Sequence, residues 1–266
     1  GALDGGGIHF SGDGGIAFDS RVLTQRITVE NSMTASIGAV AGHTLTFSGM
    51  NNAGGDGGAI AGGAGSAVML NGEGSLRFTG NGAAYGGAIG GYNVALDGVA
   101  NSFTGNSASA GGAIAGAAIA ISGGVNSFTA NSAFDGGGAI AGENTVTISG
   151  GVNNFTGNTT ANYGGAIHAG TDAALTADVG DITFSGNTHK RGGATALPNA
   201  MYLYNRDNSG ILTLAAKEGR SILFHDPIAS NGANPNLTID INKTAGSDSY
   251  SGTVLFHDPI ASNGAN

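Results

Sequence analysis

The stretch GGAIGGYNVALDGVANSFTGN, residues 86–106, is followed after four residues by a near copy, GGAIAGAAIAISGGVNSFTAN, residues 111–131. The motif GGA followed by Ile or Thr begins at six positions spaced 25–29 residues apart: Gly57, Gly86, Gly111, Gly137, Gly164 and Gly192. A second motif, Phe-Thr/Ser-Gly/Ala-Asn, begins eight or nine residues before the next GGA, at Phe78, Phe103, Phe128, Phe155 and Phe184. Repeats of this length indicate a solenoid or a propeller.

The segments between the two motifs predict short strands. Residues 93–98 (NVALDG) and 145–151 (TVTISGG) alternate apolar and polar side chains and end in Gly, as half-buried strands closed by turns do. Each repeat is expected to hold three strands: one after GGAI, one around Val94 and Leu96, and one around Phe103. A propeller blade would need about 40 residues or more. We therefore predict an all-β fold, a right-handed parallel β-helix (β-solenoid) built from three-strand coils.

In a parallel β-helix, equivalent residues of successive coils stack about 4.8 Å apart and form columns. The predicted core has an Ile column, a Phe column and a Leu/Ile column. We expect the Asn that ends each Phe motif to lie at a corner, where Asn tolerates left-handed backbone angles and passes hydrogen bonds along the stack. The double Gly is expected at another corner, where the bend needs positive φ or close approach of coils. The predicted columns are Ile60, Ile89, Ile114, Ile140 and Ile167; Phe78, Phe103, Phe128, Phe155 and Phe184; Leu70, Leu96, Ile121, Ile148 and Leu175; and Asn81, Asn106, Asn131, Asn158 and Asn187.

We predict one continuous solenoid domain with three parts. Residues 1–56 are degenerate N-terminal coils, residues 57–191 are the regular coils, and residues 192–266 are modified C-terminal coils. In the last part the segment LFHDPIASNGAN occurs twice, at 223–234 and 255–266. The sequence opens in the middle of the repeat pattern, so we expect it to be part of a longer protein.

Composition and charge exclude several classes of function. The charged fraction is only 10%, which is unlike a disordered chain, and the absence of Cys excludes disulfides and thiolate metal sites. The net charge of −9 speaks against nucleic-acid binding. The Gly-rich stretches lack the Lys-Ser/Thr of a phosphate-binding loop, and the GDGG segments do not repeat every nine residues as calcium-binding repeats do. We expect no cofactor and no metal.

Two sets of residues are candidates for binding. Residues next to the inward Phe should point outward and form a flat hydroxyl face. Its main column is Thr79, Thr104, Thr129, Thr156 and Ser185, and Arg77, Ser102, Ser127, Asn154 and Thr183 form the column beside it. The second set is the aromatic residues Tyr85, Phe134 and Tyr163, which we expect on the loop before GGA, where Lys190 and Arg191 stand in the last repeat. A solvated face and local packing between loops are the alternative interpretations of the two sets.

Parallel β-helices include polysaccharide lyases and glycosidases, so a catalytic function is an alternative. Those enzymes need clustered carboxylates or a carboxylate beside a base. The carboxylates are expected on different corners, at Asp97, Asp135, Glu143, Asp172, Asp178 and Asp181. The six His are expected to be isolated: His225 and His257 belong to the duplicated segment, and His9, His43, His168 and His189 fall in different registers. We therefore predict no catalytic residues. An ice-binding solenoid is a further alternative, although the second hydroxyl column is mixed.

The pairing of GGA[ILV] with FxxN over residues 57–193 resembles the chlamydial polymorphic membrane proteins and related Gram-negative autotransporter passengers. The resemblance implies a β-helical passenger on the bacterial surface, at the outer membrane, linked to a C-terminal membrane β-barrel that we expect outside this sequence. It also implies adhesion to a protein or glycan receptor, or self-association. The expected function is therefore a non-enzymatic surface adhesin or autoaggregation module.

Overall fold

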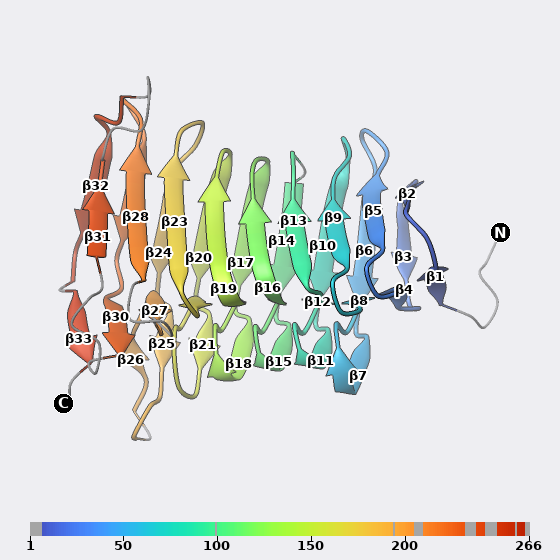
Figure 1. Ribbon diagram of the computed structural model, residues 1–266, viewed down its shortest axis with the longest axis horizontal. Helices are drawn as coiled ribbons and strands as arrows, with labels where there is room; N and C mark the ends of the chain where they lie inside the picture. Colours follow the sequence, from blue (N-terminus) through green and yellow to red (C-terminus); the bar gives the residue numbers. More distant parts are fainter. Residues whose placement is uncertain are drawn as a thin grey trace.

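A computed structural model describes residues 7–98, 100–193, 195–204, 210–231, 238–242, 249–258 and 260–263. The strands of these residues form three sheets in an elongated solenoid; two sheets run its length, and the third covers its middle part (Figure 1). The coils from β4 to β25 contribute strands to all three sheets, and successive coils pair in parallel through these strands. The described residues contain no helix. The prediction of an all-β parallel solenoid is confirmed.

The largest sheet has 17 strands and takes two short strands, or one long one, from most coils. Its strands are β1 (Ile8–Phe10), β2 (Gly14–Phe18), β4 (Ile27–Val29), β5 (Thr34–Ala39), β8 (Ile60–Gly62), β9 (Ala67–Leu70), β12 (Ile89–Gly90), β13 (Asn93–Leu96), β16 (Ile114–Ile121), β19 (Ile140–Ser149), β22 (Ile167–Ala169), β23 (Asp172–Ala177), β27 (Met201–Leu203), β28 (Ile211–Ala216), β30 (Ile228–Asn231), β31 (Thr238–Ile241) and β33 (Ala261–Asn263).

The Phe motifs form the second sheet. Its nine strands are β3 (Arg21–Leu23), β6 (Thr44–Ser48), β10 (Ser75–Thr79), β14 (Ala100–Thr104), β17 (Val125–Thr129), β20 (Val152–Thr156), β24 (Ile182–Ser185), β29 (Ser221–Phe224) and β32 (Thr253–Phe256).

The third sheet lies between the Phe motif and the next GGA, a segment that we expected to be a loop. Its seven strands are β7 (Asn51–Asp56), β11 (Gly82–Tyr85), β15 (Ser107–Ala110), β18 (Ser132–Gly136), β21 (Thr159–Thr160), β25 (Thr188–His189) and β26 (Leu197–Pro198), and β25–β26 is its antiparallel pair. The coils have three faces, as expected of three-strand coils, but this segment forms the third face. The strand after GGAI and the strand around Val94 belong to one sheet, and they are continuous in β16 and β19. A coil such as residues 89–110 has four strands on three faces, because β12 and β13 share one sheet.

The three apolar columns form the core as predicted, and they continue beyond the regular repeats. Phe78, Phe103 and Phe128 are fully buried, with ring centroids 4.8 Å apart and ring planes within 3°. The same stack includes Phe47 before them and Phe224 and Phe256 after them. The coils before residue 57 and after residue 192 therefore continue one core.

The Asn column passes hydrogen bonds from coil to coil, but its backbone differs from the prediction. Asn131 Oδ1 accepts from the backbone N–H of Asn106 (3.0 Å) and from its Nδ2 (2.9 Å), and Asn131 Nδ2 donates to the Phe103 carbonyl (3.0 Å). The left-handed φ falls on the residue before each Asn, as at Gly105 (64°) and Ala130 (53°). The Asn supplies hydrogen bonds at this corner, and the preceding residue makes the bend.

The column continues beyond Asn187 with an aspartate. Asp226, which is buried, accepts hydrogen bonds from the backbone N–H of Gly186 (2.9 Å) and from both the backbone N–H and the Nδ2 of Asn187 (each 2.8 Å). A carboxylate suits this position because these three groups are all donors.

The two corner glycines have different tasks. Gly86 has φ of 63°, where an L side chain is strained. A Cβ on Gly87 would meet the carbonyl oxygens of Gly112 and Ser107 in the next coil. The first Gly is therefore needed for the bend, and the second for the contact between coils.

The duplicated segment occupies two successive coils in the same register. Leu223 pairs with Leu255 and Ala229 with Ala261, and the exposed rings of His225 and His257 stack with centroids 4.3 Å apart. Residues 232–234 and 264–266 of the two copies lie outside the described residues.

Candidate functional site

The predicted hydroxyl face exists as a geometric feature of the nine-stranded sheet. Register pairs Thr79 with Thr104 and continues through Thr129, Thr156 and Ser185. These residues are half-buried, apart from the exposed Thr156. Ser127 and Thr129 lie within hydrogen-bond distance along one strand, with their hydroxyl oxygens 3.1 Å apart.

The three predicted aromatic residues do not form one patch. Tyr85 and Tyr163 occupy one column of the third sheet, with Ala110 and Gly136 between them. Phe134 precedes that column by two residues and is 64% exposed. Tyr85 and Tyr163 directly precede the double Gly, whereas Asp135 and Gly136 lie between Phe134 and the double Gly.

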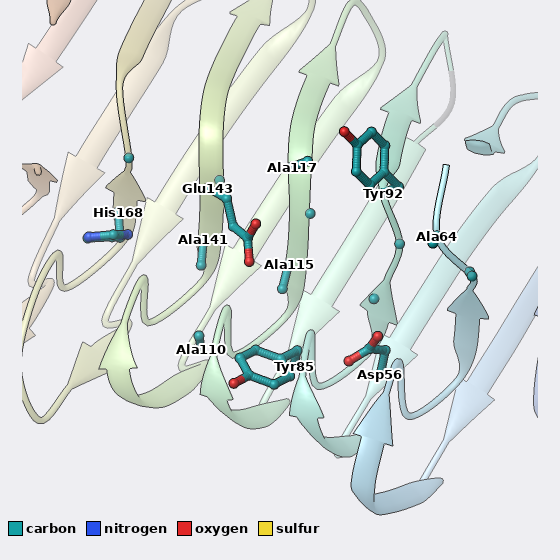
Figure 2. Close-up of a pocket in the computed structure, with 17 residues that line it drawn as sticks. Asp56, Ala64, Tyr85, Tyr92, Ala110, Ala115, Ala117, Ala141, Glu143 and His168 are labelled. Carbon is teal, nitrogen blue, oxygen red and sulfur yellow. The ribbon is translucent and has the colours of Figure 1, made fainter. Parts of the chain in front are cut away.

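A groove lies beside Tyr85, where the third sheet meets the 17-stranded sheet. It encloses a cavity of about 420 Å³ and crosses five successive coils (Figure 2). Its floor is made of small residues that follow the core Ile of each coil, where register pairs Gly90 with Ala115 and Ala115 with Ala141. Because these side chains are small, the groove stays open along the solenoid axis.

Polar and aromatic side chains form the two rims of the groove. Asp56 ends β7 and Tyr85 ends β11 on one rim, and these two residues are paired in register. Tyr92, which follows β12, and Glu143, which lies within β19, stand on the opposite rim (Figure 2). Tyr85 is 52% exposed and Tyr92 50% exposed, so their rings are available to a ligand.

Larger side chains fill the groove at its C-terminal end. Register continues the floor from Ala141 to His168 and then to Tyr202, whose rings stack with centroids 6.0 Å apart. Tyr163 packs 4.5 Å from Tyr202, and the Arg191 guanidinium lies 4.7 Å from the Tyr163 ring centre, at cation–π distance. His168 is therefore not isolated, contrary to our expectation.

Burial shifts the pKa values of two residues in this region, Tyr202 and His189. Burial, together with the neighbouring Tyr163 and Tyr204, raises the pKa of Tyr202 to about 12, and Arg191 opposes the shift. Burial, followed by the positive charge of Arg191, lowers the pKa of His189. Both residues are thus held neutral around pH 7.

Three of the six carboxylates considered for catalysis accept hydrogen bonds from backbone N–H groups at the coil turns. Asp178 accepts hydrogen bonds from the backbone N–H groups of Gly150 (2.7 Å) and Val179 (2.9 Å). Asp172 and Asp181 each accept one backbone N–H from the next coil, at 2.8 Å. Glu143, by contrast, lines the groove. Among the described residues, no three His or acidic side chains gather as a metal site, and no apolar helix has the length to cross a membrane.

Tyr163, His168 and Tyr202 form an end cluster, and of these only Tyr163 was among the sequence-based binding candidates. Tyr92 and Asp56 were absent from those candidates. One sequence signal could have shown the groove: the residue after each core Ile, which should point outward. This residue is Gly or Ala at positions 90, 115 and 141, and it is His168 in the following coil. The position of Tyr92 and Asp56 on facing rims depends on how the two sheets meet.

Comparisons with known proteins identify the type of repeat. Residues 154–170 match the Chlamydia polymorphic membrane protein repeat family. A protein of Chlamydia pneumoniae named probable outer membrane protein pmp8 is 46% identical over 81 residues, which are 29% of this chain and 8% of that protein. No solved structure matches. The chain thus carries repeats of the chlamydial polymorphic membrane protein type.

Proposed function

We propose that this chain is a surface-displayed, non-enzymatic segment of an outer membrane protein, acting in adhesion or self-association. The shared repeats and the name of the chlamydial relative support the location. The observation that carries the binding role is the repetition of outward side chains in register over consecutive coils. A partner that meets several coils at once gains avidity from contacts that are individually weak.

The hydroxyl face is the part of the surface that fits self-association. A second copy can meet the column from Thr79 to Ser185 through hydroxyl hydrogen bonds, because each hydroxyl both donates and accepts. Each such bond contributes about 0.5–1.5 kcal/mol net, so several coils must take part before association is measurable.

The test uses the 266-residue chain on beads, with bead aggregation and binding to cells as readouts. The variant T104K/T129K/T156K places like charges on successive rungs of the hydroxyl face. The control S107K/S132K/T159K adds the same charge at the same coil spacing on the third sheet, where these residues are in register. We expect the first variant to lose aggregation and the control to keep it.

Two results would overturn the proposal. If both variants fold and aggregate as the unmodified chain does, the hydroxyl face is only solvated. If the chain depolymerises a polysaccharide and one carboxylate substitution, such as E143Q, abolishes that turnover, the protein is an enzyme.

A further inference from the structure

We propose that the groove between Tyr85 and Tyr92 binds an uncharged oligosaccharide that lies along the solenoid axis. This inference rests on the proposed adhesive function and names a ligand class for one part of the surface.

The shape of the groove suits an extended chain molecule. Its lining comes from five successive coils, from Gly62 to His168. Neighbouring coils are 4.8 Å apart, so four steps between them give a length of about 19 Å. The end cluster of His168, Tyr163 and Tyr202 closes one end. A linear ligand with a repeating unit can therefore contact equivalent positions in several coils.

The backbone of the floor is already paired, which disfavours a peptide strand. Gly91 N–H donates to the Ala115 carbonyl (3.1 Å), Ala117 N–H to the Tyr92 carbonyl (2.8 Å), and Gly170 N–H to the Gly142 carbonyl (2.8 Å). An added strand requires a sheet edge with free N–H and C=O groups. Recognition in this groove must therefore use the side chains of the rims.

The rim side chains have the chemistry that recognises sugars. The half-exposed rings of Tyr85 and Tyr92 present apolar faces to the C–H faces of pyranose rings, and their hydroxyls remain available for hydrogen bonds. Asp56 and Glu143 supply only acceptors when ionised, which suits the hydroxyl donors of a sugar. Glu143 reaches into the groove between Ala141 and Ala115 (Figure 2).

The negative charge of the groove favours neutral sugars over acidic ones. Among the described residues that line the groove, the acidic side chains are Asp56 and Glu143, His168 stands at one end, and there is no Lys or Arg. Uronic acids, sialic acids and sulfated sugars would place anions beside these carboxylates without a compensating cation. A neutral glycan meets no such repulsion.

The experiment measures binding of the 266-residue chain to immobilised maltohexaose, cellohexaose and chitohexaose, followed by calorimetry with the best of them. Polygalacturonic acid and an oligolysine peptide form the acidic and basic arms. The groove variants are Y85A/Y92A and E143Q. The control is F134A, which removes a more exposed aromatic residue from β18 outside the groove lining. Circular dichroism and thermal unfolding establish that each variant is folded.

We expect at least one neutral oligosaccharide to bind the unmodified chain. Its affinity should fall about tenfold or more in Y85A/Y92A and should also fall in E143Q. Its affinity should be unchanged in F134A. The proposal is overturned if no neutral probe binds, if the acidic or basic arm binds better, or if Y85A/Y92A binds as tightly as F134A. Bead aggregation measured on the same variants separates the two claims. Aggregation without any glycan binding refutes the groove ligand and leaves the adhesive function standing.

Discussion

Replacing Asn131 with Ala tests the hydrogen-bonded column that joins the coils. Asn131 is fully buried in the middle of the stack. The substitution removes the acceptor of the Asn106 backbone N–H (3.0 Å) and a donor to the Phe103 carbonyl (3.0 Å). It also breaks the side-chain bonds to Asn106 (2.9 Å) and Asn158 (3.0 Å).

The expected cost follows from the groups left behind. Asn106 Nδ2 still donates to the Phe78 carbonyl, and Asn158 Oδ1 still accepts from the backbone N–H of residue 131. Two buried backbone groups therefore lose a partner, at about 1–3 kcal/mol each, which gives about 2–6 kcal/mol in total. Asn131→Asp should be no better at pH 7, because its carboxylate would face the Phe103 carbonyl and Asn158 Oδ1 without a proton to donate.

Urea unfolding followed by circular dichroism measures the effect. The matched control is Asn154→Ala, a half-buried outward residue of β20, which should change stability by less than about 0.5 kcal/mol. Asn131→Asp should regain stability on acidification, since a protonated carboxyl can donate. If Asn131→Ala is as stable as the control, the column does not hold the coils together and the reasoning fails.

Three further predictions concern the core, the corner and the end cluster. Phe128→Ala should destabilise by about 3–5 kcal/mol in the same urea assay, because it opens a cavity between rings stacked 4.8 Å away on both sides; a loss under about 1 kcal/mol would contradict a packed column. Gly87→Ala should disrupt folding, since its Cβ would meet the Gly112 carbonyl oxygen, whereas the neighbouring Ala88→Gly should fold with a modest loss on thermal unfolding. Because the folded-state pKa of Tyr202 is about 12 and the unfolded value about 10, stability should fall as pH rises from about 10 to about 12. Tyr202→Phe should flatten that dependence, and an unchanged slope would show that another group causes it.

The core was predictable because its signal is repeated. Phe103, Phe128 and Phe155 keep their phase with GGA, so one alignment places each column. Inward and outward side chains alternate along the Phe strand, so the residue two before the Phe should also be buried. In three coils this residue is Asn, and it forms a second buried column. Asn101 Nδ2 donates to Asn126 Oδ1 (2.8 Å), and Asn126 Nδ2 donates to Asn153 Oδ1 (2.9 Å). This column was missed because Leu76 and Ile182 occupy this position in the flanking coils.

The third sheet and the groove were harder to predict for physical reasons. Segments such as SASA at β15 have low strand propensity, and coil-to-coil pairing holds them extended. The groove depends on two rims that belong to different sheets, and the spacing of Asp56 and Tyr92 along the chain does not show that they face one groove. The hydroxyl face was predictable as a column, since it follows directly from the inward Phe.

The central claim is that this solenoid binds glycans through outward side chains of consecutive coils, in the groove between Tyr85 and Tyr92. Hydroxyl-radical footprinting of the chain, free and bound to glycan-bearing cells, tests it most directly, because exposed aromatic side chains are readily oxidised. The account predicts that binding protects Tyr85 and Tyr92, which are about half exposed, and leaves Phe134 as reactive as in the free chain. Binding that protects none of these residues, or protects Phe134 as strongly as the two tyrosines, would contradict it.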